Sequence, residues 1–287
     1  MKVAVIGSTG QLGQDLMRVF SEEAVGFAHR DLDVTDEAGV ASAIKSAGPD
    51  WVLNTAAFHR VDDCELDPTL TFAVNAVGAL NVARAAADIG SGVVFYSTDY
   101  VFGGQSRERD HPYEEGDGPQ PLSVYGASKV AGEQLVMQAN ARHIVVRSAG
   151  LYGTATSRKG WTFPELMLNK ARTEGVIRVV TDQVLSPTFT ADLARKTREL
   201  LEHDARGLFH LTNAGECSWF EFARGALDTA RVEAEMEPIG TAQLQQRARR
   251  PSYSALITAR LEEIGLSPLR SWQDALSDYL HTKGAIP

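Results

Sequence analysis

The chain has 287 residues, of which 44% are hydrophobic, and its formal net charge at pH 7 is −9. This apolar content can fill a large core, in one large lobe or two coupled lobes. The negative charge argues against nucleic acid as a partner, although a nucleotide would need only a local positive site. No apolar run approaches the ~20 residues of a membrane span, and the N-terminus lacks the pattern of a signal peptide. Because the two cysteines, Cys64 and Cys217, form neither a disulfide framework nor a metal-ligand cluster, we expect a cytoplasmic protein without membrane association or metal.

Short apolar, β-branched runs alternate with helical patterns along the chain. The predicted strands are 3–6, 25–28, 51–54, 93–97, 144–147, 177–180 and 208–211, and the predicted helices are 11–20, 37–46, 69–89, 124–139, 162–173, 190–203, 218–230 and 272–281. This alternation predicts an α/β fold with a Rossmann-type, doubly wound parallel sheet covered on both faces. We place the nucleotide-binding domain at 1–147, with a return of the chain to it around 177–211, and most of a smaller C-terminal substrate-binding lobe at 148–287.

Three glycines follow the first predicted strand at G-x-x-G-x-x-G spacing. Gly7 permits a tight turn, Gly10 permits close approach of the backbone to a pyrophosphate, and Gly13 permits close packing of the next helix. The spacing is one residue longer than the usual Rossmann fingerprint, and such turns also occur for packing reasons alone. The order strand, turn, helix at this point favours phosphate binding.

A second pattern concerns proton transfer. Tyr125 and Lys129 lie four residues apart, on one face of a helix if the segment is helical. A phenol titrates near ~10, and a nearby ammonium lowers that pKa toward the range of general acid–base catalysis. Thr98 directly follows an apolar run, where its hydroxyl either takes part in catalysis or satisfies a backbone group at the strand end. The glycine turn earlier in the chain favours the catalytic interpretation.

These residues and their order resemble the extended short-chain dehydrogenase/reductase family, and within it the dTDP-4-dehydrorhamnose reductase (RmlD-like) branch. The resemblance covers nearly the whole chain and includes 7–13, 32–36, 49–57, 61–62, 74–75, 97–102, 121–129, 147–153, 182–183, 187–188, 250–251 and 256. It implies an NAD(P)H-dependent oxidoreductase that reduces a nucleotide-linked 4-keto sugar. Tyr125 would donate the proton to the keto oxygen, Thr98 would hydrogen-bond the same oxygen, and Lys129 would hold the nicotinamide ribose and lower the Tyr125 pKa.

The resemblance also implies a set of cofactor-binding residues, in addition to the glycines, Tyr125 and Lys129. They are Thr9, Gln11 and Leu12 at the pyrophosphate, Asp33 and Val34 at the adenine, and Ala56, Ala57, Phe58 and Tyr96 along the groove. Arg30 follows the second predicted strand, where an acidic residue would favour NADH and an arginine suits a 2′-phosphate. We therefore expect NADPH, with NADH as the other possibility.

The sugar-binding half departs from the family pattern. Gly150 stands where a tryptophan is frequent, Val184-Leu185 where an aromatic residue and a glycine are common, and Tyr253 where an asparagine is usual. The resemblance implies that Thr98, Asp99, Tyr125, Gly150 and Arg250 contact the substrate. Asp99 would bond sugar hydroxyls, and a helix or turn cap is its other possible role. Tyr100 replaces the glutamate of related dehydratases, which favours simple reduction.

Two other classes of function stay open. One is a nucleotide-sugar epimerase, and the other is a non-catalytic NAD(P)-binding regulatory subunit. The helix predicted at 69–89 either pairs with a second subunit, giving a homodimer, or simply packs in the core. The sugar and its nucleotide base are not determined by these patterns.

Overall fold

The computed structural model describes residues 1–104, 109–155 and 160–285. Six parallel strands form the central sheet in the order β10-β5-β4-β3-β1-β2. Their bounds are β1 (Val3–Ile6), β2 (Ala24–Phe27), β3 (Trp51–Asn54), β4 (Gly92–Thr98), β5 (His143–Ser148) and β10 (Gly207–His210). All six begin and end within one residue of their predicted positions. The predicted Rossmann-type sheet is therefore confirmed.

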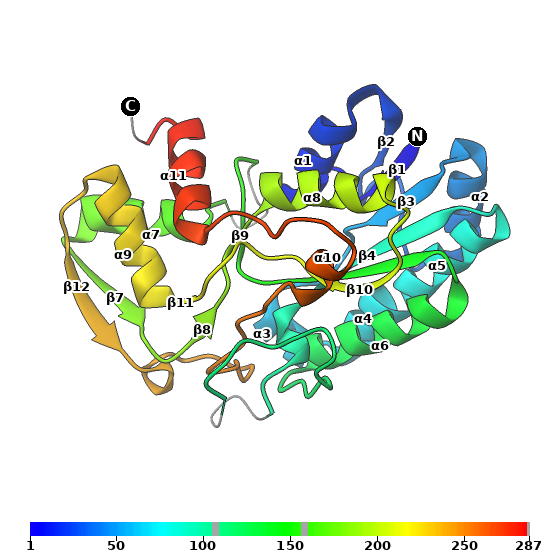
Figure 1. Cartoon of the computed structure of the whole chain (residues 1–287). Coiled ribbons are helices and arrows are strands. Elements are labelled where there is room, and N and C mark those ends of the chain that lie inside the picture. Colours follow the sequence, from blue (N-terminus) through cyan, green and yellow to red (C-terminus); the bar gives the residue numbers. More distant parts are fainter. Residues whose placement is uncertain (105–108, 156–159, 286–287) are drawn as a thin grey trace.

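Helices cover both faces of this sheet (Figure 1). α1 (Gln11–Phe20) and α8 (Thr190–Glu202) lie on one face, where Leu16 and Leu193 join a core cluster with Val94 and Tyr96 of β4. On the other face lie α2 (Glu37–Ala47), α5 (Gly78–Asp88) and α6 (Val124–Ala139). Successive side chains of β4 point alternately to the two faces, as the period of a strand requires. Phe95 accordingly joins the second cluster.

Local sequence fixes where two of these helices begin. The Asp36 side chain accepts a hydrogen bond from the Gly39 N–H at the start of α2, and the Ser123 side chain accepts one from the Gly126 N–H at the start of α6. Such caps satisfy backbone donors that have no partner within the helix. The Ser123 cap sets the first turn of α6, which carries Tyr125.

The helix predicted at 69–89 is a continuous run of α4 (Pro68–Phe72), a π-helical turn (Ala73–Val77) and α5. Among the described residues, the run Pro68–Asp88 is long and apolar enough to cross a membrane by length and composition. This corrects our expectation that no stretch approaches that length. Because 56% of its most apolar window is buried inside the protein, and α5 contributes Val82 and Ala86 to the core, it packs as a core helix.

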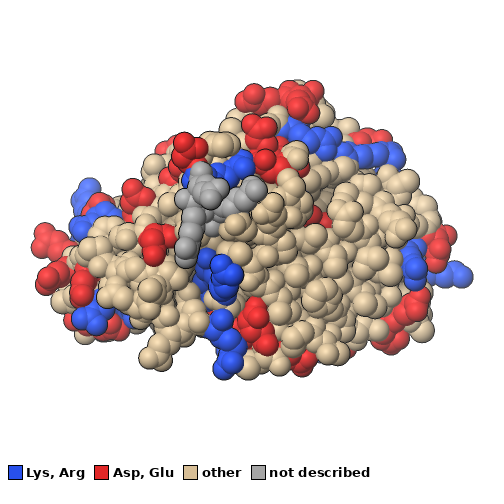
Figure 2. All heavy atoms as spheres, turned by 90° about the horizontal axis from the view of Figure 1, so that it is seen from below, with Lys and Arg blue, Asp and Glu red and all other residues tan. Residues whose placement is uncertain are grey.

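One face of the molecule is poor in charge. Figure 2 shows a broad surface with few charged side chains over the helices below the sheet, bordered by charged residues. On α3 (Val61–Leu66) and the helical run that follows it, the exposed apolar side chains include Leu66, Leu70, Phe72 and Val77. The pairing of this region with a second subunit stays a prediction.

The smaller lobe is built mainly from the C-terminal part of the chain. β7 (Val176–Val180) and β12 (Glu235–Ile239) form a parallel pair against α7 (Phe163–Glu174) and α9 (Trp219–Ala230). Two further helices are α10 (Ala259–Glu263) and α11 (Trp272–Thr282). Two short strand pairs are β6 (Leu151–Tyr152) with β9 (Thr188–Phe189) and β8 (Val184–Leu185) with β11 (Cys217–Ser218). In the chain as a whole, 3-10 turns lie at Ser21–Glu23, Asp99–Val101 and Thr241–Gln243.

The structure corrects one part of the predicted domain division. We expected the chain to return to the first domain at about residue 177, but β7 pairs with β12 in the smaller lobe. The return begins with α8, which packs on α1, and is completed by β10, which pairs with β5. A strand pattern predicts a strand but does not identify its partner, because pairing is decided by distant residues.

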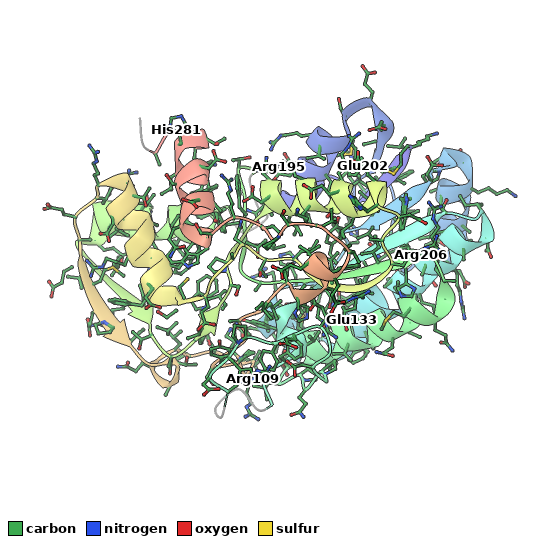
Figure 3. The ribbon with its side chains drawn as sticks, in the orientation of Figure 1. Arg109, Glu133, Arg195, Glu202, Arg206 and His281 are labelled. Carbon is green, nitrogen blue, oxygen red and sulfur yellow. The ribbon has the colours of Figure 1, made fainter. Side chains whose placement is uncertain are left out.

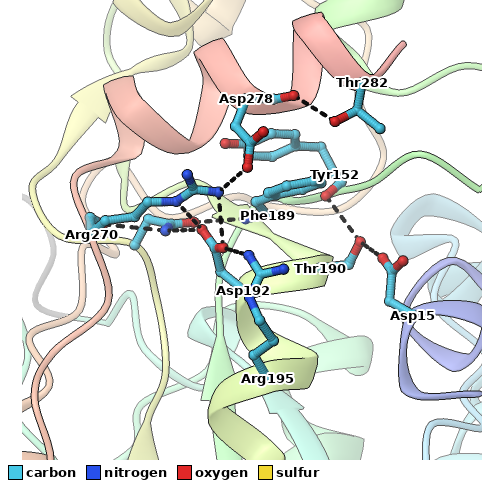
Figure 4. A network of polar contacts seen from close by, with 10 residues as sticks. Asp15, Tyr152, Phe189, Thr190, Asp192, Arg195, Arg270, Asp278 and Thr282 are labelled. Atoms are coloured by element: carbon cyan, nitrogen blue, oxygen red, sulfur yellow. Dashed lines mark hydrogen bonds and ion pairs between the residues drawn. The ribbon is translucent and has the colours of Figure 1, made fainter. Parts of the chain in front are cut away.

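The two lobes meet through a network of polar contacts (Figure 4). Thr190 at the start of α8 donates to Asp15 of α1, and the same hydroxyl contacts the Tyr152 carbonyl. Asp192 accepts hydrogen bonds from Arg270, which also pairs with Asp278 of α11. This partly buried network joins the helix after the glycine turn to the C-terminal lobe.

Candidate active site

Thr98 and Tyr125 meet at the carboxyl end of β4. Thr98 is the last residue of that strand, and Tyr125 lies in the first turn of α6. The Thr98 side chain acts on the Tyr125 phenol and lowers its pKa. Both line a cavity of about 240 Å³, together with Asp99, His59, Gln183 and Trp219 among others. The sequence-predicted partners Thr98 and Tyr125 are thus side by side at the edge of the sheet where ligands of open α/β sheets bind.

The Thr98 side chain has further partners. Its Oγ1 donates to Asp99 Oδ1 at 3.1 Å and accepts from the Tyr100 N–H at 3.2 Å. The expected alternative, a strand-end hydroxyl that bonds the backbone, is therefore also present. The bond accepted from the Tyr100 N–H does not use the Thr98 proton, because a hydroxyl has one proton and two acceptor sites.

Burial controls the titration of both helix residues. Removal from water raises the pKa of the Tyr125 phenol above its usual value, although the Thr98 side chain lowers it in part. Burial also lowers the pKa of Lys129 to about 7, because it outweighs the opposite effect of the Glu133 carboxylate. The predicted lowering of the Tyr125 pKa by Lys129 is thus wrong for this structure. The physical reason is that desolvation dominates and that the Lys129 Nζ lies over the Phe95 ring, 4.0 Å from its centroid.

Glu133 follows Lys129 by one turn of α6 and points toward the sheet (Figure 3). Its carboxylate accepts from Arg147 Nε at 2.9 Å, from Arg147 Nη2 at 2.7 Å and from Ser97 Oγ at 2.5 Å. Glu133 is fully buried and Arg147 nearly so. This paired charge fixes α6 against β4 and β5, and with it the positions of Tyr125 and Lys129. Losing one partner of such a buried pair is strongly destabilising.

The glycine turn has the geometry that a dinucleotide requires. Gly7 has φ +80°, and a Cβ there would lie 2.5 Å from Thr55 Oγ1. A Cβ on Gly13 would lie 2.2 Å from the Gly7 carbonyl oxygen, so that only glycine lets α1 pack on the turn. Gly10 is the N-cap of α1 and makes no side-chain cap hydrogen bond. The helix therefore presents backbone N–H groups at its N-terminus, where anions bind favourably.

The residues around this turn fit a dinucleotide to different degrees. Thr9 is exposed and Gln11 half-buried, with Gln11 Nε2 near the Gly153 carbonyl, whereas Leu12 is buried in the core. Arg30 extends into solvent at 87% side-chain exposure, 3.5 Å from Asp31. Asp33 accepts two hydrogen bonds from Thr35, which hold its pKa below the usual value.

The other residues predicted to line the cofactor groove lie in the segments after β2 and β3. Val34 is buried against Gly78, and Ala56, Ala57 and Phe58 are half-buried after β3. The Phe58 backbone is held by the Asn75 side chain, which accepts from its N–H and donates to its carbonyl.

Tyr96, which the resemblance places along the cofactor groove, has its side chain on the inner side of the protein. It is buried in the core, and its hydroxyl donates to Thr197 of α8. The Tyr96 side chain therefore points toward the helices that cover this face of the sheet, a direction that the sequence resemblance does not reveal.

On the predicted substrate side of the cavity, Gly150 lies beside Trp219. The sequence indicates the first of these two residues but not the second. Gly150 has φ +51°, and a Cβ there would lie 2.6 Å from Leu185 and 3.6 Å from the Trp219 ring. Trp219 therefore occupies the space beside Gly150. It also borders a second cavity of about 250 Å³, lined by Tyr100, Phe163, Met167, Gln183 and Arg250 among others.

We interpreted Trp219 from the sequence as a packing anchor. Its ring does pack on Phe163, with centroids 4.5 Å apart, but it also forms the wall shared by the two cavities. Ser254 was missed as well, and it lies at the catalytic corner, where its Oγ donates to Asp99. No local pattern marks Ser254, because its partner is 155 residues away.

Arg250 was expected to contact the substrate. It lines the second cavity, yet its guanidinium donates to both carboxylate oxygens of Asp62 at 3.1 Å and to the Ala248 carbonyl. Its main contacts therefore connect the C-terminal segment to α3. Among the described residues, no group of three His, Cys, Asp or Glu side chains is placed to hold a metal ion.

A glycine turn, a Thr–Tyr pair at the end of β4 and a neighbouring lobe define a Rossmann-type oxidoreductase of the extended short-chain dehydrogenase/reductase class. The RmlD substrate binding domain family matches residues 1–284, and the chain belongs to this family. The resemblance inferred from the sequence is confirmed.

Named relatives agree over nearly the full length. The chain is 35% identical over 287 residues to the spore coat polysaccharide biosynthesis protein SpsK of Bacillus subtilis, covering 99% of this chain and 98% of that protein. It is 37% identical over 286 residues to dTDP-4-dehydrorhamnose reductase of Mycolicibacterium smegmatis, covering 96% of this chain and 84% of that protein. The crystal structure of dTDP-4-dehydrorhamnose reductase from Bacillus anthracis in complex with NADP superposes with a TM-score of 0.93 at 34% identity, covering 98% and 100% of the two chains.

Proposed function

We propose that this protein uses NADPH to reduce the keto group of a nucleotide-linked 4-keto sugar, as the names of its relatives suggest. The observation that carries the proposal is the Thr98–Tyr125 pair, which lines a cavity together with residues of the smaller lobe. The keto sugar occupies this cavity. A 4-keto-6-deoxy sugar linked to dTDP is the leading candidate.

The glycine turn holds the cofactor pyrophosphate through the N-terminus of α1, and the groove after β3 receives the nicotinamide half. When bound, NADPH supplies the hydride. Arg30 follows β2 by three residues, and an exposed arginine there suits a 2′-phosphate, which supports NADPH over NADH.

Tyr125 is the proton donor. Its raised pKa keeps the phenol protonated at neutral pH, which is the form that a reduction needs. The proton moves from the phenol to the keto oxygen as the hydride reaches the carbonyl carbon. Thr98 donates a hydrogen bond to the same oxygen and stabilises its growing negative charge. Lys129 lies one turn beyond Tyr125 and supplies positive charge beside the nicotinamide ribose.

The proposal is tested by mixing the protein with NADPH and a panel of dTDP- and UDP-linked 4-keto sugars and following the absorbance of NADPH. Tyr125→Phe should lower turnover at least ~100-fold, because it removes the proton donor. Tyr100→Phe is the matched control, since its ring lies 6.1 Å from that of Tyr125 and both side chains are half-buried.

Three results would contradict the proposal in different ways. Turnover of a nucleotide sugar without consumption of NADPH would indicate an epimerase. Cofactor binding without turnover of any sugar in the panel would indicate the regulatory-subunit alternative. Equal loss in the two tyrosine variants would show that Tyr125 is not the donor.

A further inference from the structure

The oxygen of Thr98 is held in place from two sides. The Tyr100 N–H donates to Thr98 Oγ1 at 3.2 Å, and the strand β4 fixes the backbone of Thr98 next to Ser148 of β5. Thr98 is 7% exposed, so that its side chain has little freedom to rotate. The position of the oxygen is set, but the direction of its single proton is not.

That proton is directed at Asp99 in the structure, where the Thr98 Oγ1 donates to Asp99 Oδ1. A carboxylate accepts hydrogen bonds only, whereas a protonated carboxyl group can donate one. An ionised Asp99 therefore holds the Thr98 proton. A neutral Asp99 can instead donate to Thr98 Oγ1 and leave the Thr98 proton to the keto oxygen.

The other oxygen of Asp99 is also fixed. Ser254 Oγ donates to Asp99 Oδ2 at 2.6 Å, and Asp99 and Ser254 are each 3% exposed. Ser254 belongs to a segment tied to β8, since the Ser254 N–H donates to the Val184 carbonyl at 2.8 Å. The smaller lobe thus orients the carboxyl group that faces Thr98.

We propose that Asp99 is a positioning residue whose carboxyl group, oriented by Ser254, decides whether the Thr98 proton points to Asp99 or to the keto oxygen of the substrate. This inference rests on the proposed function. It differs from the sequence-based expectation that Asp99 bonds sugar hydroxyls. It also makes Ser254, through its hydrogen bond to Asp99, part of the control of catalysis.

The surroundings of Asp99 make such a choice accessible near neutral pH. Burial raises the pKa of Asp99 to about 6, against the lowering by hydrogen bonds from Ser254 and Thr98. The titratable groups that face it are Tyr100 on its own 3-10 turn and Tyr125 on α6, while His59 lines the same cavity. The Asp62–Arg250 pair lies beyond Tyr100. Below about pH 6 the neutral form of Asp99 prevails, and the Thr98 proton becomes available to the substrate.

The test compares the pH profiles of kcat/KM between pH 5 and 9 in the unmodified protein and in variants. The benefit from Thr98, measured as the ratio of the unmodified protein to Thr98→Val, should rise at least ~3-fold as the pH falls through the Asp99 transition. In an Asp99→Asn background the amide can donate at every pH, so the same ratio should be high and independent of pH. Ser254→Ala removes a hydrogen bond to the ionised form and should move the transition to higher pH.

His59→Gln is the control, because histidine side chains titrate in the same range. It should leave the transition in place. The proposal is overturned if Asp99→Asn keeps the transition of the unmodified protein, or if Ser254→Ala does not move it. An Asp99→Asn variant that raises KM for the sugar at every pH without altering the transition would instead support direct sugar binding.

The outcomes separate this inference from the proposed function. Loss of the proposed function would appear as an unmodified protein that does not consume NADPH with any keto sugar. Failure of the inference alone would appear as full turnover with pH profiles that do not respond to Asp99 or Ser254. If Asp99→Asn does not fold, as judged by circular dichroism, the shift in Ser254→Ala still decides.

Discussion

The cofactor side and the sugar side of the active site are built in different ways. The pyrophosphate turn of the cofactor side is a continuous stretch of local structure, in which β1, the turn at Gly7 and the N-terminus of α1 follow one another within 13 residues. The sugar side assembles Asp99, Gly150, Trp219 and Ser254 from segments far apart in the chain. The first depends on backbone geometry and tolerates few side chains, whereas the second depends on side chains that can be exchanged. We therefore expect substitutions in the turn to be tolerated less well than substitutions on the sugar side.

The largest effect is expected from adding a methyl group to the cofactor turn. Gly13→Ala places a Cβ 2.2 Å from the Gly7 carbonyl oxygen, which is backbone and cannot move without opening the turn. We expect the free energy of unfolding to fall by about 1–3 kcal/mol or more and NADPH binding to weaken strongly. Urea unfolding and NADPH fluorescence titration measure the two effects. Gly116→Ala is the control, because a Cβ there meets nothing within 4 Å.

If Gly13→Ala has the same free energy of unfolding and the same NADPH affinity as Gly116→Ala, the backbone of the turn does not limit which side chains it accepts. The contrast between a backbone-built cofactor side and a side-chain-built sugar side would then be wrong.

An intermediate effect is expected from the wall between the two cavities. Trp219→Ala should raise KM for the nucleotide sugar about 10-fold, because the indole borders both cavities, while KM for NADPH should change little. Steady-state kinetics with each substrate varied in turn measure this split. Trp161→Ala, at a tryptophan that is 53% exposed, is the control. Equal changes in both KM values would show that Trp219 acts through general stability rather than through the sugar.

The smallest effect is expected at the edge of the cofactor groove. Arg30→Ala should reduce the preference for NADPH over NADH by about 3- to 10-fold, since one exposed cation contributes modestly to binding a phosphate. The ratio of kcat/KM for the two cofactors measures it. Arg224→Ala, on α9 beside the Phe220 ring, is the control. An unchanged ratio in Arg30→Ala would show that another group reads the 2′-phosphate.

Much of the cofactor side could be predicted from the sequence for a physical reason. Gly7, Gly10 and Gly13 are required by steric limits that act over a few residues, so their spacing shows the turn directly. The strands of the central sheet are short apolar runs whose burial on both faces leaves a clear pattern. The pairing of Thr98 with Tyr125 followed from a family pattern of the same kind.

The tertiary structure alone decided what these residues experience. The raised pKa of Tyr125, the position of the Lys129 ammonium over Phe95 and the core location of Tyr96 all result from packing by distant elements. The partner of β7, the wall formed by Trp219 and the hydrogen bond from Ser254 to Asp99 have the same origin. Short-range steric rules are recorded in neighbouring residues, whereas desolvation and contact between segments depend on how the whole chain packs.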